Sequence, residues 1–519
     1  MPSPSSPFLK LPPELRNAIY EQYVLAEGGY VYNFELGKLC AANDPEHPVD
    51  LALIYTCTQI ANEMKGIALS CNVVTFRTFS SPNLDLRASR FHEIMQESER
   101  AAADLFGSVS YAQCYKHVLD ELVRVFPECQ PLLQLVKAMG QTSPPLSDAA
   151  QGASITNHWK GVPSVTRELL FYAVDVALKL GCDLPEEHGI LAHDLLEIQS
   201  TYMPWTIPTE NETTNTIRKF NKKRWGNRQT EIGKMYPFSA ASVAIKFLHH
   251  TPISTRKYLR KIVILEDRTS VAFPECHAKG LIPFCMENPF LHVERRLDLW
   301  RTILCPFDYL YPTWWPVGSM SIDDLARWIV EAMDLFRAGM PEKSFSLVLD
   351  GGPDLEKSSQ FFEFVQRYTM WQEAIEEACA RKLLWTPPLC LIRIHLLYIR
   401  EHVPTILRAM TNNESFFIRC NFNIDASWNI EQIIHQNRHC SELQWIDNYH
   451  DEWSKHDYET RYKHVKNPFQ PFQRWRDFYT TEYIYPTERW RYTDESIALR
   501  LHVSRFNYPE NQSESESLR

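Results

Sequence analysis

The chain of 519 residues is 44% hydrophobic and 12% aromatic, with 14 Trp, so it is too rich in core-forming side chains to be a disordered protein. Its net charge of −10 argues against a general binder of nucleic acid or of anionic membranes. Thirteen cysteines, spread from Cys40 to Cys440 without a short-range framework, favour a reducing compartment over a disulfide-stapled secreted protein.

The N-terminus and the apolar runs predict neither export nor a membrane span. The opening MPSPSSPFLK lacks the basic start and the continuous apolar stretch of a secretory signal. The run LLFYAVDVALKLG is shorter than the roughly 20 residues that a bilayer requires, and it contains charges. We therefore expect a cytoplasmic and/or nuclear protein with no membrane partner.

Two apolar blocks follow a disordered N-terminus at residues 1–7. The stretch FLKLPPELRNAIYEQYVL predicts a short helix, because Pro13 is tolerated in a first helical turn and Glu14 complements the positive end of the helix. The block Val49–Phe79 predicts a helix that is followed by a β-branched strand at NVVTF. We expect these elements to pack together as an N-terminal subdomain over residues 8–80.

The rest of the chain predicts helices first and then alternating helices and strands. Residues 81–205 are mainly helical in pattern, and 206–236 form a polar and then basic loop or linker. Residues 237–508 predict a mixed α/β region, and 509–519 a disordered tail. Within that region, strands are expected at KIVILED, SFSLVLDGG, LCLIRIHL and SFFIRCNFNI, and a long helix at 354–382. The predicted fold class is α+β and predominantly helical.

The helix at the N-terminus has one apolar face. Leu11, Leu15, Ile19 and Tyr23 recur every four residues, which places them on one side of the helix. An isolated helix of this length is marginal in water. Its apolar face must therefore contact either the chain's own second block or another protein.

The same residues carry a resemblance. LPPELRNAIYE resembles the L-P-x-E-L opening of an F-box, in the LPxELRNxIY form of a family of F-box-like fungal proteins. The second block is similar to that family in Leu53, Cys57, Gln59, Ile60 and Glu63, followed by the strand at 72–76.

An F-box docks on a Skp-type adaptor and so connects a substrate-binding region to a cullin ubiquitin ligase. The resemblance implies an F-box-like helical subdomain in which Leu11, Pro12, Leu15 and Ile19 face the adaptor. About 25 residues separate the two blocks here, where a compact F-box has a short turn. Packing of this face within the chain remains the alternative.

Other patterns indicate chemistry less specifically. His435 and His439 share a helix face, but Gln436 stands where a zinc protease needs Glu. Cys276, His277 and Cys285 do not have zinc-ligand spacing. No metal site and no cofactor are predicted.

Acidic residues close two predicted strands, and a basic run precedes them. Glu266, Asp267, Asp350 and Asp354 could act in acid–base chemistry, although Asp-Gly-Gly-Pro-Asp is also an ordinary turn with a helix cap. Lys222, Lys223 and Arg224 are a candidate nuclear import signal, or an exposed loop.

The sequence lacks the commonest motifs of nucleotide-binding and hydrolytic enzymes. We therefore expect a non-catalytic interaction protein that is a candidate substrate-recruiting ligase subunit, with an unknown protein substrate. The alternatives are an enzyme that uses the strand-end acids, or a nuclear protein associated with nucleic acid, although a nucleic-acid partner is not favoured.

Overall fold

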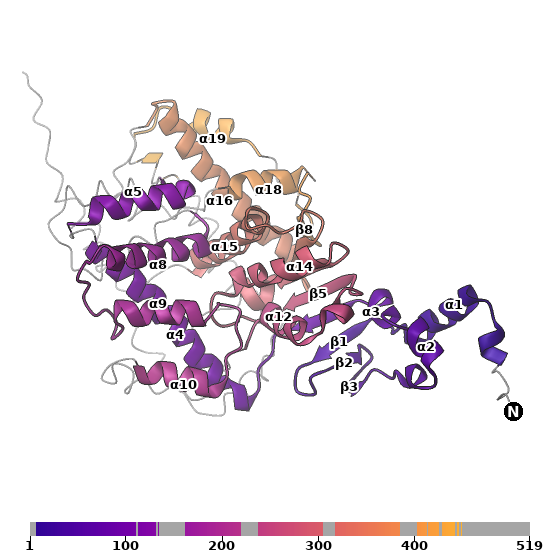
Figure 1. Cartoon of the computed structure of the whole chain (residues 1–519). Helices are drawn as coiled ribbons and strands as arrows, with labels where there is room; N and C mark the ends of the chain where they lie inside the picture. Colours follow the sequence, from indigo (N-terminus) through magenta and orange to yellow (C-terminus); the bar gives the residue numbers. More distant parts are fainter. Residues whose placement is uncertain are drawn as a thin grey trace, which may run out of the picture. The chain divides into compact units, whose positions relative to one another are not determined.

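The computed structural model describes residues 7–109, 113–130, 161–219, 237–304, 317–384, 402–412, 414–424 and 428–441, and the single positions 133, 444, 445 and 448 (Figure 1). The chain divides into two units, Met1–Pro471 and Phe472–Arg519. All described residues belong to the first unit. The candidate import signal at 222–224 and the strand expected at LCLIRIHL lie outside the described residues.

The described strands form one mixed, eight-stranded sheet in the order β3-β2-β1-β4-β5-β6-β7-β8. Strands β1 and β4 to β8 run parallel to one another, whereas β2 pairs antiparallel with β1 on one side and with β3 on the other. Their bounds are β1 Tyr30–Asn33, β2 Lys38–Ala41, β3 Asp44–Pro48, β4 Val74–Arg77, β5 Lys261–Glu266, β6 His292–Asp298, β7 Phe345–Asp350 and β8 Ile418–Cys420.

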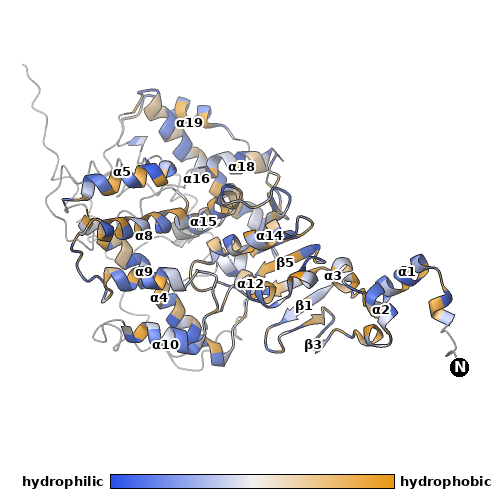
Figure 2. Ribbon diagram, viewed as in Figure 1, coloured by the Kyte–Doolittle hydropathy of each residue, from blue (hydrophilic) through white to orange (hydrophobic). Residues whose placement is uncertain are grey.

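The parallel strands lie side by side in chain order, and this order determines where the helices lie. Crossovers between parallel strands are almost always right-handed, so successive crossovers in one direction place their helices on the same face of the sheet. On that face, Ile262, Val293, Leu347 and Ile418 join one hydrophobic core with the helices that connect the strands. Figure 2 shows β5 mostly in orange, whereas the polar helix α10 (Glu210–Lys219) is mostly blue.

The opposite face of the central strands carries charged residues among its apolar ones. Glu294 lies on it, and its carboxylate oxygens are 2.9 Å from Lys261 Nζ and 2.6 Å from the Arg296 guanidinium. Because side chains alternate along a strand, these charges stand between the apolar residues of the helix-covered face.

Beyond the short helices that precede β4, the helices form two groups. Those that cover the sheet or follow its strands are α12 Ala240–His250, α13 Ile253–Arg256, η4 Pro274–Leu281, α14 Ile282–Glu287, the π-helical turn η5 Leu299–Ile303, α15 Val317–Arg337, α16 Leu355–Ala380, α18 Val403–Thr411 and α19 Ile430–Asn437. Those of the insertion between β4 and β5 are α4 Pro82–Val109, α5 Tyr115–Val125, η3 Pro127–Cys129, α8 Pro163–Lys179, α9 Ala192–Thr201 and α10. The insertion has its own core, which α4, α5, α8 and α9 share.

The structure confirms a mixed α/β fold, in which about 59% of the described residues are helical. Strands at KIVILED, SFSLVLDGG and NVVTF are present, and Gly181 follows the end of α8 with φ of 75°. Strand β6 escaped prediction, because HVERRLD carries charges that the fold buries. Among the described residues, no helix is long and apolar enough to cross a membrane.

Two further findings were not expected from the sequence. The polar stretch between the two N-terminal blocks forms β1, β2 and β3 rather than a loop. Cys114 and Cys182 form a disulfide that closes a separation of 68 residues, although the cysteine pattern indicated a reducing compartment.

Candidate partner-binding surface

Helix α1 spans Pro13–Val24 and begins as the double proline predicts. Pro12 stands at the N-cap, and its carbonyl accepts hydrogen bonds from the backbone N–H groups of Leu15 and Arg16, both at 3.1 Å. Pro13 occupies the first turn, where its missing N–H would have no helical partner. The helix therefore has a defined start and a fixed orientation of its faces.

The buried face of α1 is not the face that the apolar pattern indicated. Arg16, Tyr20 and Val24 are its buried residues, and they repeat every four positions. Tyr20 and Val24 share a small core with Ile60 of α2 (Thr58–Glu63) and with Met64, which caps it. The short helices of this region are η1 Pro7–Lys10, η2 Ala52–Tyr55 and α3 Ile67–Cys71, and α1 contacts α3.

Glu63 organises the contact between α1 and α2. Its carboxylate accepts hydrogen bonds from Arg16 at 2.8 and 2.5 Å, from the Tyr20 hydroxyl at 2.8 Å and from Gln59 at 3.0 Å. The bonds from Arg16, Gln59 and Tyr20 lower the pKa of Glu63 to about 2. A two-pronged pair of this kind fixes geometry as well as charge, so it sets the rotation of α1 about its axis.

Asn72 fixes the other end of α1. Its side-chain amide donates to the carbonyls of Val24 and Ala68, both at 2.9 Å, and its carbonyl accepts from the backbone N–H of Ala26 at 2.9 Å. The hydroxyl of Tyr30 also donates to the Val24 carbonyl, at 2.7 Å. The carbonyl at the last residue of the helix is therefore held by two donors.

An exposed apolar stripe runs along α1 beside the row of residues that packs against α2. We call Leu15, Ile19 and Tyr23 the α1 stripe; their side chains are 53%, 43% and 40% exposed. Leu25, just after the helix, is also exposed. Single exposed apolar residues are common on protein surfaces, but an aligned row on a helix whose neighbouring row is anchored to the chain is a candidate interaction surface.

The structure places the four predicted contact residues as follows. Leu15 and Ile19 lie in the stripe, Pro12 is exposed at the N-cap, and Leu11 is half-buried with its carbonyl bonded to Arg16. The apolar face of α1 therefore does not pack within the described part of the chain. The apolar pattern does not indicate the internal face, because that face includes the charged residue Arg16. The signal for it is the four-residue spacing of Arg16 and Tyr20 together with an acid, Glu63, in the second block.

The strand-end acids have structural roles. Glu266 is buried, pairs with buried Arg295 at 2.6 Å, and accepts from the N–H groups of Ala240 and Ala241 at the start of α12. Asp350 accepts from the backbone of Gly352 and from the side chain of Asn421. Asp354 caps α16 through the N–H of Lys357, and Asp267 accepts from Thr78. Each of the four acids thus has a hydrogen-bond partner within the fold.

The histidine and cysteine candidates are likewise engaged in the fold. Buried His277 donates from Nε2 to the Ala272 carbonyl at 2.6 Å and accepts at Nδ1 from the Ser239 hydroxyl at 2.7 Å; burial lowers its pKa to about 3. His439 contacts Arg438. Among the described residues, no group of three or more His, Cys, Asp or Glu is arranged to hold a metal ion.

Compared with protein-family models, with curated proteins and with solved structures, the chain gives no match. The exposed surface of α1 is therefore the main indication of function that the structure offers.

Proposed function

We propose that the chain is a non-catalytic interaction protein whose α1 stripe docks on another protein. The observation that carries the proposal is the division of α1 into two faces. Arg16, Tyr20 and Val24 hold the helix to the chain, whereas Leu15 and Ile19 are exposed on it. A helix presented in this way is a preformed apolar ridge that a groove on a partner can accept.

The F-box resemblance supplies the class of partner. The residues that resemble an F-box, 11–21 and 53–76, are those that build the anchored helix and its support. A Skp-type adaptor is therefore the partner we propose, and the chain would be a substrate-recruiting subunit of a cullin ubiquitin ligase. The antiparallel meander β1 to β3 occupies the interval between the two blocks.

The proposal is tested by co-purifying the full chain with a Skp-type adaptor. We expect the double variant Leu15→Asp, Ile19→Asp to bind the adaptor about 30-fold to 1,000-fold more weakly, because each of these half-exposed side chains should contribute about 1–2 kcal/mol when the interface buries the rest of it. The matched control is Asn17→Asp, Gln22→Asp, which adds the same charge at exposed positions of the same helix.

Both double variants should fold, because none of the four positions is buried. Adaptor binding that survives the stripe variant would refute the proposed surface, and a chain that binds no adaptor at all would remove the ligase assignment. Aggregation of the stripe variant, with a soluble control, would mean that the stripe packs within the chain.

A further inference from the structure

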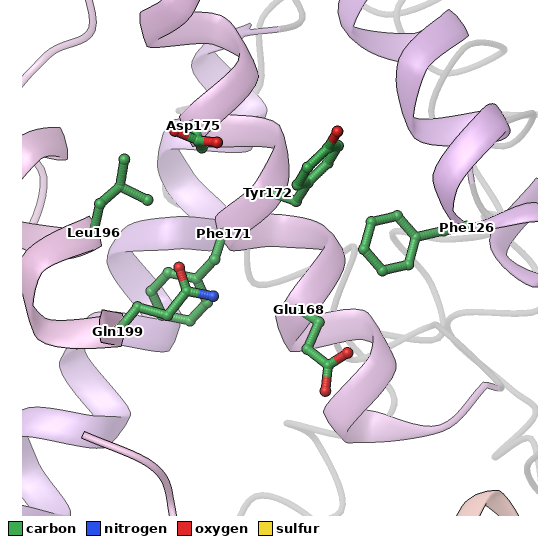
Figure 3. Close-up of a pocket in the computed structure, with 7 residues that line it drawn as sticks. All are labelled: Phe126, Glu168, Phe171, Tyr172, Asp175, Leu196 and Gln199. Carbon is green, nitrogen blue, oxygen red and sulfur yellow. The ribbon is translucent and has the colours of Figure 1, made fainter. Parts of the chain in front are cut away.

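Helix α8 carries a second patterned surface, in the helical insertion. Glu168, Phe171, Tyr172 and Asp175 follow the i, i+3, i+4, i+7 spacing that places residues on one face of a helix. Figure 3 shows this row beside Leu196 and Gln199 of α9 on one side and Phe126, after α5, on the other. These residues line a pocket of about 330 Å³, which we call the α8 pocket.

The floor of the α8 pocket is aromatic and its two ends are acidic. The rings of Phe126 and Tyr172 meet edge to face at 5.7 Å, and Phe171 lies between the two acids in the helical order. Asp175 lies seven positions after Glu168 in the helix, which corresponds to about 10 Å along the axis. A cation over an aromatic ring is stabilised by the ring, and a nearby carboxylate adds to that attraction.

Neighbouring groups hold this arrangement in place. The Tyr172 hydroxyl donates to Glu121 at 2.9 Å, which ties the pocket to α5. At its start, α8 is anchored to α15, where Ser164 donates its backbone N–H and its hydroxyl to buried Glu331 at 2.7 and 2.8 Å. Most of the residues that line the pocket therefore belong to packed helices, and Phe126 directly follows one of them.

The charge around the α8 pocket favours a basic ligand. Residues 161–201 contain seven acids and two bases. The cations recorded against the two pocket acids are Lys279, 3.6 Å from Glu168, and Lys179, 2.5 Å from Asp175. Lys279 lies closer to Asp334, at 2.9 Å, and the Lys179 pair is exposed and easily exchanged.

We propose that the α8 pocket binds a basic amphipathic helix of another protein. Such a helix would present Lys or Arg at positions i and i+7 to Asp175 and Glu168, and apolar residues at i+3 and i+4 to the aromatic floor. The inference rests on the proposed function, because this pocket would hold the recruited protein while the α1 stripe holds the adaptor. The two surfaces share no residue.

The test uses two synthetic 18-residue helical peptides of one composition and the full chain. In the first peptide, Arg at i and i+7 flanks Leu at i+3 and i+4; in the second, the Arg residues are moved to the opposite face. We expect saturable binding of the first peptide in fluorescence polarisation, and weaker binding as salt is raised. The rearranged peptide should bind at least fivefold more weakly.

Variants of the chain locate the site. Glu168→Gln, Asp175→Asn should weaken binding of the first peptide about fivefold to twentyfold, whereas Asp120→Asn, Asp183→Asn, which removes the same charge from exposed positions outside the pocket, should not. Lys179→Gln should tighten binding, because it releases Asp175.

Three results would overturn the inference: no saturable binding to the unaltered chain at about 1 mM, equal binding of the two peptides, or equal weakening by the pocket and control variants. Retention of the adaptor in the same preparation would show that only this inference, and not the proposed function, has failed.

Discussion

Asn72 is the residue through which the support of the α1 stripe can be measured. It is buried, and its side chain makes three hydrogen bonds to backbone groups of α1, of the turn that follows and of α3. In Asn72→Ala these bonds are lost together, while Leu15 and Ile19 are untouched. The variant therefore separates the anchoring of α1 from the contacts of its exposed face.

The magnitude follows from the groups left without a partner. The Ala26 N–H loses its acceptor on Asn72, the Ala68 carbonyl loses its donor there, and the Val24 carbonyl keeps only the bond from Tyr30. A buried polar group without a partner costs about 1–3 kcal/mol. Because the Ala26 and Ala68 groups are only partly buried, we take about 1–2 kcal/mol for each and expect α1 to open about 2–4 kcal/mol more readily. That change corresponds to amide exchange in α1 that is about 30-fold to 1,000-fold faster.

Hydrogen exchange read by mass spectrometry reports this opening segment by segment. Peptides that cover residues 13–24 should exchange faster in Asn72→Ala, whereas α12, in the core of the sheet layer, should be unchanged. Asn17→Ala, at an exposed position of α1, is the control. Unchanged exchange at 13–24, or equal acceleration in α12, would refute the view that Asn72 anchors α1 locally.

Three further predictions concern other parts of the fold. Asp104 and Glu97 accept hydrogen bonds from the two ring nitrogens of His188 and raise its pKa to about 9. The stability that protonated His188 contributes is therefore complete below about pH 6.5 and is lost as pH rises through 9. The fall in Tm from pH 7 to 10 should be smaller in His188→Gln than in the unaltered chain. Glu266→Ala leaves Arg295 buried without its partner and should cost about 3–5 kcal/mol, measured as loss of soluble protein. Non-reducing peptide mapping should recover Cys114 linked to Cys182, and replacing both by Ser should lower stability by about 4 kcal/mol.

Much of the fold could be predicted because, in many segments, the spacing of apolar residues matches the side that is buried in the folded chain. KIVILED is a β-branched run, and it forms β5, which has a strand on each side of it in the sheet. Residues 354–382 carry a long apolar stripe, and they form the helix α16 as expected. Strand β6 could not be found in this way, because Arg295 and Glu294 are charged residues that are buried by pairing with partners far along the chain.

The candidate surface was predictable in its residues but not in its exposure. The four-residue spacing of Leu15, Ile19 and Tyr23 identified a face, yet no pattern within α1 could show that Arg16 and Tyr20 would take the buried side. That choice depends on Glu63, which lies 47 residues from Arg16. The α8 pocket was not predicted either, because two of its lining residues, Phe126 after α5 and Leu196 in α9, lie far apart in the sequence.

The central claim is that α1 carries a docking surface for a Skp-type adaptor. The most direct measurement is the affinity of the purified full chain for the adaptor, compared with Leu15→Asp, Ile19→Asp and with Asn17→Asp, Gln22→Asp. We predict that the first double variant loses at least 30-fold in affinity and that the second binds as the unaltered chain does. Equal affinities for all three chains would contradict the account.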